Sequence, residues 1–262
     1  MTRQNFYKAK KQRDAYKLDS DFIVSSVLEV RREQPRLGGR KLLKLLGEQL
    51  EKAGIQVGRD RFFDVLREKN LLVERRRRFA RTTDSRHNLP VFHNLIKDLE
   101  IAAPNQVWVS DITYIRTGNS FIYLSLITDA YSRKIVGWNA GDTLEAIGCL
   151  NALQEALKAL PADCSPIHHS DRGCQYCCHA YVDALTKAGL TISMTEQNHC
   201  YENALAERVN GIVKDEYNLG ARFIDKKQAI QAIKQAINLY NNKRPHLALN
   251  FQFPAQVHEK AA

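Results

Sequence analysis

The spacing of apolar residues changes near residue 105, and this change divides the chain into two parts that must fold differently. Before it, apolar residues recur at steps of three and four, which predicts helices at 21–33, 39–53 and 59–70. After it, stretches rich in β-branched and aromatic residues are separated by short turns, which predicts an antiparallel meander of strands at 106–115, 121–128 and 134–139.

Beyond these strands, helical and strand-like stretches alternate. Helical periodicity is found at 143–160, 178–188, 201–219 and 225–241, and strand-like runs at 165–169 and 190–194. A sheet whose later strands are followed by helices is typical of an α/β fold. For a chain of 262 residues we therefore expect a small, basic, helix-turn-helix-like region over 1–81, a linker over 82–104 and an α/β domain over 105–262.

Positive charge is concentrated in the first third of the chain. Residues 1–90 contain 23 basic and 12 acidic side chains, whereas the other 172 residues contain 16 and 17. A domain this basic is the usual footprint of a polyanion such as nucleic acid. The helix at 59–70 follows a glycine-bounded turn, so it is a candidate recognition helix that carries Arg59, Arg61 and Arg67. A three-helix unit with no role in DNA binding is the alternative.

An arginine run follows this region and is a candidate for phosphate contacts. Five arginines within seven positions repel one another unless an anion neutralises them. A solvated charge run is the alternative. The residues are Arg75, Arg76, Arg77, Arg78 and Arg81.

The chain contains no run of about 18 apolar residues, and its first residues are polar and basic. We therefore expect a cytoplasmic, nucleoid-associated protein with no membrane partner. Six cysteines in such a chain favour free, buried thiols over disulfides. A zinc site is the less favoured alternative for one cluster, which comprises Cys174, Cys177, Cys178, His179, His199 and Cys200.

Asp111 lies in the middle of the first expected strand, in a largely apolar stretch. Strands are depleted in aspartate, and an unpaired buried carboxylate is costly, so Asp111 needs a cationic partner. An arginine in a salt bridge or a divalent metal ion would meet this need.

Two further acids lie downstream. Asp171 follows the strand at 165–169, in a turn where capping of the next helix is the ordinary role. Glu207 lies on a polar helix face with Asn203, Asn210 and Lys214, and a solvated helix face is the ordinary reading of such a stripe.

Taken together, these acids resemble a known pattern. There are 59 residues between Asp111 and Asp171, 35 between Asp171 and Glu207, and a lysine seven residues beyond the glutamate. This spacing resembles the D-x(n)-D-x(35)-E pattern of retroviral integrases and related transposases. The stretches 105–115, 169–176, 203–207 and 240–249 are similar to successive motifs of the second-frame (OrfB) transposase of bacterial insertion sequences with two overlapping, frame-shifted reading frames.

The resemblance implies a ribonuclease-H-like catalytic core with a mixed five-stranded sheet. It implies that Asp111, Asp171 and Glu207 are catalytic and bind metal. Carboxylates suit hard divalent ions, so two Mg²⁺ ions are expected, with Mn²⁺ as a substitute. Lys214, Arg244 and His246 are expected to contact DNA.

The implied activity is that of a DDE transposase: DNA strand cleavage and strand transfer at terminal inverted repeats, with target DNA as second substrate. The implied partners are the first-frame (OrfA) product, alone or as a fusion, and further copies of the chain on DNA. The sequence leaves two other functions open, a non-catalytic DNA-binding regulator or decayed transposase and a ribonuclease-H-like nuclease without transfer activity.

Overall fold

The computed structural model describes residues 3–74, 89–118, 120–196 and 200–260. The chain divides after Arg76 into two compact units. The whole predicted arginine run, residues 75–78 and 81, lies outside the described residues, so its role in DNA binding stays a prediction. Among the helices of the described ranges, none is long and apolar enough to cross a membrane.

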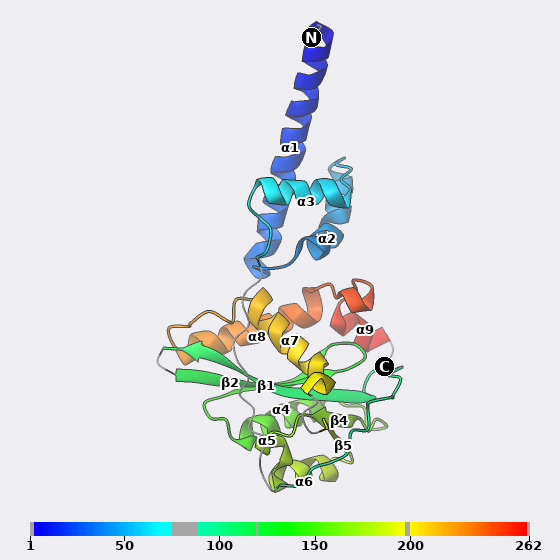
Figure 1. Ribbon diagram of the computed structural model, residues 1–262, viewed down its shortest axis with the longest axis vertical. Coiled ribbons are helices and arrows are strands. Elements are labelled where there is room, and N and C mark those ends of the chain that lie inside the picture. Colours follow the sequence, from blue (N-terminus) through cyan, green and yellow to red (C-terminus); the bar gives the residue numbers. More distant parts are fainter. Residues whose placement is uncertain (1–2, 75–88, 119, 197–199, 261–262) are drawn as a thin grey trace. The chain divides into compact units, whose positions relative to one another are not determined.

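The N-terminal unit consists of three helices, as the periodicity predicts. They are α1 (Arg3–Glu33), α2 (Gly39–Lys52) and α3 (Arg59–Glu68), and they pack around aliphatic and aromatic side chains that include Ile23, Leu42 and Phe62. Helix α1 begins at Arg3 rather than at residue 21, and its first half extends beyond α2 and α3 (Figure 1). That half has no apolar stripe, but it is rich in the strong helix formers Lys, Arg, Gln and Ala.

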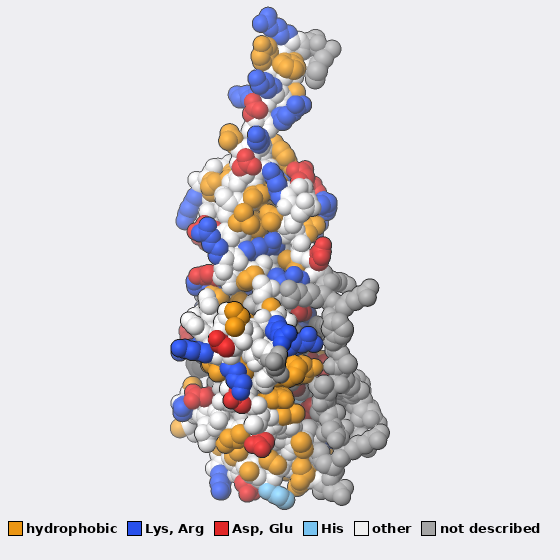
Figure 2. Space-filling view, turned by 90° about the vertical axis from the view of Figure 1, so that its left-hand side faces the viewer, with side chains coloured by type: hydrophobic (Ala, Val, Ile, Leu, Met, Phe, Trp, Pro, Cys, Tyr) orange, Lys and Arg blue, Asp and Glu red, His pale blue; other side chains and the backbone are white. Residues whose placement is uncertain are grey.

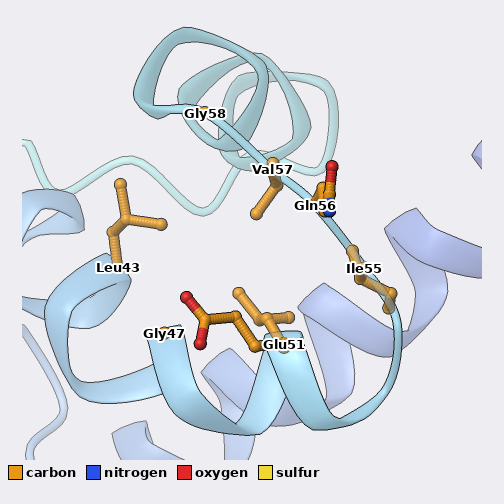
Figure 3. Close-up of a pocket in the computed structure, with 8 residues that line it drawn as sticks. Leu43, Gly47, Glu51, Ile55, Gln56, Val57 and Gly58 are labelled. Atoms are coloured by element: carbon orange, nitrogen blue, oxygen red, sulfur yellow. The ribbon is translucent and has the colours of Figure 1, made fainter.

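A hollow of about 480 Å³ lies between α2 and the loop that leads to α3. Its lining is apolar except for Gln56 and Glu51 (Figure 3). The loop leaves α2 through Gly54, whose φ of 74° favours glycine. The hollow belongs to the N-terminal unit, whereas the three predicted acids all belong to the C-terminal unit.

The C-terminal unit is built on a mixed five-stranded sheet with the strand order β3-β2-β1-β4-β5. The first three strands form the predicted antiparallel meander, and β4 and β5 run parallel to β1. The strands are β1 (Val107–Thr117), β2 (Ser120–Asp129), β3 (Ile135–Gly141), β4 (Ile167–Ser170) and β5 (Thr191–Met194). The prediction of a mixed five-stranded sheet is confirmed.

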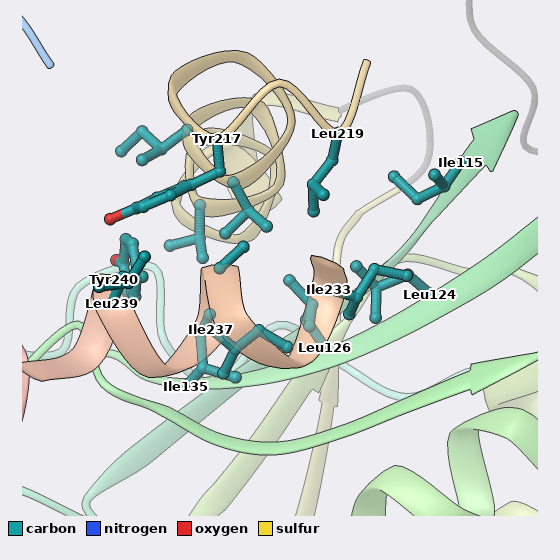
Figure 4. Close-up of a cluster of buried hydrophobic side chains, with 14 of the residues drawn as sticks. Ile115, Leu124, Leu126, Ile135, Tyr217, Leu219, Ile233, Ile237, Leu239 and Tyr240 are labelled. Carbon is teal, nitrogen blue, oxygen red and sulfur yellow. The ribbon is translucent and has the colours of Figure 1, made fainter. Parts of the chain in front are cut away.

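Helices cover both faces of this sheet (Figure 1). On one face, α4 (Ala146–Lys158), α5 (Cys174–Cys177) and α6 (His179–Lys187) pack around Trp108 and Ile127. On the other face, α7 (Ala204–Glu216) and α8 (Lys226–Lys243) pack on Ile115, Leu124 and Leu126 (Figure 4). The remaining elements are η1 (Cys200–Asn203), η2 (Leu247–Leu249) and α9 (Pro254–Lys260).

The described part of the predicted linker, residues 89–104, packs against the sheet. The Met194 amide donates to the His93 carbonyl at 3.4 Å, and the Leu95 amide donates to Ser193 Oγ at 2.9 Å. The apolar side chains of Leu89, Phe92, Ile96, Leu99 and Ile101 join the cores of the C-terminal unit. This part of the chain therefore covers the edge strand β5 instead of forming a free linker.

Candidate active site

The parallel pairing of β1 with β4 brings two distant acids together. In this register Ser110 lies opposite Ser170, the last residue of β4; Asp111 is the next residue on β1, and Asp171 is the first residue after β4. Neighbouring strands lie about 4.8 Å apart. Two carboxylates that are far apart in the sequence therefore lie side by side, where β4 ends and β1 continues.

The loop after β4 is shaped around Asp171. The Gly173 amide donates to Asp171 Oδ1 at 3.0 Å. A Cβ at position 173 would lie 3.0 Å from the same oxygen and 3.1 Å from Gln175 Oε1, so a glycine leaves room for the turn. The turn fixes one carboxylate oxygen of Asp171 beside β1.

Helix α7 is fastened to β1 by two buried asparagines. Asn203 Nδ2 donates to the Ser110 carbonyl at 3.0 Å, and Asn210 Nδ2 donates to Asp111 Oδ2 at 2.8 Å. Glu207 is exposed and lies one turn before Asn210 on the same helix face. The three predicted acids therefore come to one region from three different elements.

The surroundings of Asp111 disfavour the ionised form of its carboxyl group. Burial, followed by the negative charges of Asp171 and, to a smaller extent, Glu207, raises the pKa of Asp111 to about 7. Hydrogen bonds from Asn210 and from the Ile112 amide oppose this rise. A cation at this position would relieve the electrostatic repulsion between the acids.

The donors suit a magnesium ion, although they do not enclose one. Within the described ranges, no group of three or more His, Cys, Asp or Glu side chains is arranged to hold a metal ion. Mg²⁺ is usually bound through one or two carboxylates, with water and substrate phosphates as further ligands. The adjacent carboxylates of Asp111 and Asp171 match that mode, and Glu207 lies near enough to interact electrostatically with Asp111.

Below the acids lies a buried polar network. His168 Nε2 lies 2.7 Å from Ser110 Oγ and 3.0 Å from the Tyr181 hydroxyl, and burial lowers the pKa of His168 to about 3. His169 Nδ1 lies 2.9 Å from Ser193 Oγ. Both rings are fully buried and stay neutral near pH 7. His168 links β4 to β1 and α6, and His169 links β4 to β5.

Lys214 lies two turns beyond Glu207. Its Nζ lies 4.8 Å from the centre of the Tyr114 ring, and burial lowers its pKa. The nearby charge of Arg116 lowers this pKa further, whereas that of Asp111 raises it. The predicted DNA contact is therefore a half-buried ammonium beside the acids.

The two candidates in the C-terminal motif have different surroundings. Arg244 is 2% exposed and donates to Glu216 through Nε at 2.7 Å and Nη2 at 2.9 Å. This burial contradicts the predicted DNA contact of Arg244, because its guanidinium is already bound by Glu216. Glu216 is distant in the sequence, so local sequence patterns do not predict the pair. His246 is half-buried, with its ring centre 6.5 Å from that of Tyr240, and its contact with DNA stays a prediction.

The described members of the predicted cysteine and histidine cluster are not arranged as a zinc site. Cys177 is buried and its Sγ lies 3.7 Å from Met194 Sδ, whereas Cys174 is exposed. No set of three zinc ligands occurs in the part of the chain that the structure describes. His199 and the Cys200 side chain lie outside it.

The polar face of the helix expected at 201–219 includes Asn203 and Asn210, but the sequence assigns neither of them a role in the site. The signal was present, because Asn203, Glu207, Asn210 and Lys214 recur at steps of four, three and four. Their contacts with β1 depend on tertiary packing, which that spacing does not specify.

Comparisons with known proteins agree with this geometry. Two integrase core domain families match the chain, one over residues 102–200 and one over 188–254. The insertion element IS600 uncharacterized 31 kDa protein of Shigella sonnei is 38% identical over 231 residues, which cover 87% of this chain and 84% of that protein. The transposase for insertion sequence element IS629 of Shigella sonnei is 30% identical over 253 residues, which cover 97% of this chain and 82% of that protein.

A chain of the simian T-cell lymphotropic virus intasome, solved in complex with the PP2A regulatory subunit B56 gamma, has the same fold. The TM-score is 0.53 at 18% identity, and the match covers 84% of this chain and 70% of that chain. The predicted ribonuclease-H-like core and the predicted family are both confirmed. The chain therefore belongs to the IS3 family of transposases, as an OrfB-like protein with an integrase core domain.

Proposed function

We propose that this transposase catalyses metal-dependent DNA strand cleavage and strand transfer at the ends of its insertion sequence. The observation that carries the proposal is the register of β1 and β4, which sets Asp111 beside Asp171, while Asn210 fastens α7 and its Glu207 to Asp111. Phosphodiester displacement builds negative charge on the attacking and leaving oxygens, and a site of clustered carboxylates can hold the cations that offset it.

Each residue has a distinct role in this proposal. Asp111 and Asp171 would hold Mg²⁺, or Mn²⁺ in its place, with Glu207 as a further oxygen ligand. Bound divalent ions supply activation of the attacking hydroxyl and stabilisation of the leaving oxygen. Asn210 keeps the Asp111 carboxylate in one orientation, because it occupies Oδ2 while the Ile112 amide occupies Oδ1. The Lys214 ammonium would neutralise a DNA phosphate beside these acids.

The substrates in this proposal are the terminal inverted repeats of the element and a target duplex. The first-frame (OrfA) product, or a fusion with it, and further copies of the chain would hold two ends together during transfer. Phosphate contacts outside the acids are assigned to His246 and to the arginine run, which comprises Arg75, Arg76, Arg77, Arg78 and Arg81.

A nicking assay tests the catalytic role. Labelled duplexes that end in the inverted repeats are incubated with the full chain, Mg²⁺ or Mn²⁺ and the first-frame protein. We expect Asp111→Asn and Glu207→Gln to lower the nicking rate by roughly three orders of magnitude, with DNA binding unchanged. The exposed Asp183 of α6 gives the matched control, since Asp183→Asn removes an acid away from the site.

If the wild type and both variants bind DNA equally and none of them nicks, the catalytic proposal fails. The chain would then act as a non-catalytic DNA-binding regulator. If nicking occurs without strand transfer, the narrower nuclease function is correct.

A further inference from the structure

The helix predicted to read DNA carries no net charge. Within α3, Arg59, Arg61 and Arg67 are balanced by Asp60, Asp64 and Glu68. Arg59 Nε lies 2.9 Å from Asp60 Oδ1, and Arg67 forms an ion pair with Asp64. The cations of α3 are thus already paired within the N-terminal unit.

The remaining arginine of α3, Arg61, contacts side chains of α1. Arg61 Nη2 lies 2.8 Å from Asp19 Oδ2, and its guanidinium lies 5.3 Å from the centre of the Tyr16 ring. Lys69, directly after α3, pairs with Asp21 at 3.7 Å. These contacts anchor the middle of α1, from Tyr16 to Asp21, on α3. They pair positive charges at α3 with acidic and aromatic side chains of the same unit.

The first half of α1 has the opposite character. Residues 3–17 contain six basic side chains and one acidic side chain, a surplus of five positive charges. All six cations are exposed, and within the described ranges none of them forms an ion pair with an acid. Figure 2 shows Lys and Arg side chains along this projecting segment. They are Arg3, Lys8, Lys10, Lys11, Arg13 and Lys17.

Four of these cations lie on one face of the helix. Arg3, Lys10, Arg13 and Lys17 recur at steps of seven, three and four, so they form a stripe about 21 Å long at a rise of 1.5 Å per residue. Asp14 lies on the same face, so this face carries three more positive than negative charges. Like charges at these spacings destabilise a helix, and phosphates of a polyanion offset the remaining repulsion. The stripe is therefore more favourable next to a polyanion than in water.

We propose that this stripe on α1, and not α3, is the part of the N-terminal unit that contacts the phosphates of duplex DNA. The inference takes DNA as the partner from the proposed function. A second copy of the chain is disfavoured as the occupant, because two such helices would place positive charge against positive charge. The large apolar side chains near its start, Phe6 and Tyr7, are adjacent in sequence and do not form a coiled-coil seam.

The test compares two full-length variants that each lose three positive charges. One carries Lys10→Gln, Arg13→Gln and Lys17→Gln on α1, and the matched control carries Arg59→Gln, Arg67→Gln and Lys69→Gln at α3. Both are made in the Glu207→Gln background so that the labelled duplex is not cut. Circular dichroism shows whether each variant keeps its helices.

Binding to a duplex of arbitrary sequence is then measured between about 50 and 300 mM NaCl. We expect the α1 variant to bind at least about tenfold more weakly at 0.1 M salt, with a log–log salt slope that is flatter by about 2–3. The α3 variant should stay within about twofold of the parent, with an unchanged slope.

Equal losses in the two variants, or a larger loss in the α3 variant, would overturn the inference. A change in the sedimentation of the α1 variant without DNA, at unchanged affinity for DNA, would mean that the stripe binds another copy instead, which also overturns it. The outcome is separate from the catalytic proposal. A chain that binds through α1 but does not nick refutes only catalysis, whereas one that nicks but binds independently of α1 refutes only this inference.

Discussion

The two units of the chain treat the same kind of ion pair differently. In the N-terminal unit, Arg61 and Asp19 lie 2.8 Å apart and remain 40% and 32% exposed. In the C-terminal unit, Arg244 and Glu216 lie 2.7 Å apart, but they are only 2% and 17% exposed. The distances are nearly equal, so the difference lies in desolvation, which decides how much an ion pair matters to stability.

In the proposed function, this contrast separates the unit that binds DNA from the unit that carries the chemistry. The N-terminal unit keeps its surplus charge at the surface, where a polyanion can reach it. The C-terminal unit buries charge, and where the charge is not balanced, as at Asp111, the pKa is displaced. Shifted pKa values are common at functional sites, because catalysis requires ionisable groups in environments that do not favour their ordinary charge state.

The largest effect is expected from Glu216→Gln. The substitution leaves the Arg244 guanidinium buried without its counter-charge, which costs about 3–5 kcal/mol of unfolding free energy. Both tryptophans, Trp108 and Trp138, lie in the C-terminal unit, so their fluorescence during urea unfolding reports this unit alone. A loss below about 1 kcal/mol would show that this pair behaves like an exposed one and would remove the contrast.

A gain in stability is expected from Asp111→Asn. The raised pKa means that the stability contributed by protonated Asp111 is lost as the pH rises through about 7. The neutral amide removes that loss, so the unfolding free energy at pH 8 without divalent ions should rise by on the order of 2 kcal/mol. Glu207→Gln, at an exposed position, is the matched control and should change stability little. An unchanged or lower stability of Asp111→Asn would contradict the interpretation that burial and the neighbouring acids destabilise the ionised Asp111.

The buried His168 predicts a pH dependence of the opposite sign. Its pKa falls from 6.5 to about 3 on folding, so its contribution is complete above pH 6.5 and is lost as the pH falls below that value. The slope is about 1.4 kcal/mol per pH unit. Because Asp111 acts oppositely in this range, the comparison is made in the Asp111→Asn background.

In that background, His168→Gln should flatten the dependence of the unfolding free energy between about pH 6 and 4.5. His179→Gln on the exposed face of α6 is the control and should leave the slope unchanged. Equal slopes for the two variants would mean that His168 accepts a proton in the folded state.

The smallest effect is expected from Asp19→Asn in the N-terminal unit. An ion pair this exposed contributes less than about 1 kcal/mol. Thermal unfolding of the full chain, followed by the helical circular dichroism signal, measures the change. A loss as large as that of Glu216→Gln would show that exposure does not separate the two units.

Local sequence patterns anticipated the elements that carry a strong period. In the strands around Asp111, apolar and polar residues alternate or β-branched residues are frequent, and α7 has an apolar stripe opposite its polar face. The strands, α7 and the order of elements along the C-terminal unit could therefore be predicted. The first half of α1 could not, because its few apolar residues do not recur at a helical period.

Contacts between distant residues set the remaining limits. The burial of Arg244 depends on Glu216, which lies 28 residues earlier, and the role of Asn210 depends on Asp111, which lies 99 residues earlier. Residues 89–104 look like a linker because their apolar side chains follow no period, yet they cover the edge of β5. The charge balance of α3 was visible in the sequence, but its pairing with Asp19 was not.

The central claim is that Asp111 and Asp171, which β1 and β4 set side by side, form a divalent-metal site. Electron paramagnetic resonance of Mn²⁺ titrated into the full chain with duplex DNA tests it directly, with Asp111→Asn, Asp171→Asn and the control Asp183→Asn alongside the wild type. We expect saturable binding in the wild type and the control, and an affinity at least about tenfold lower in both site variants. Equal Mn²⁺ affinity in all four proteins would contradict the account.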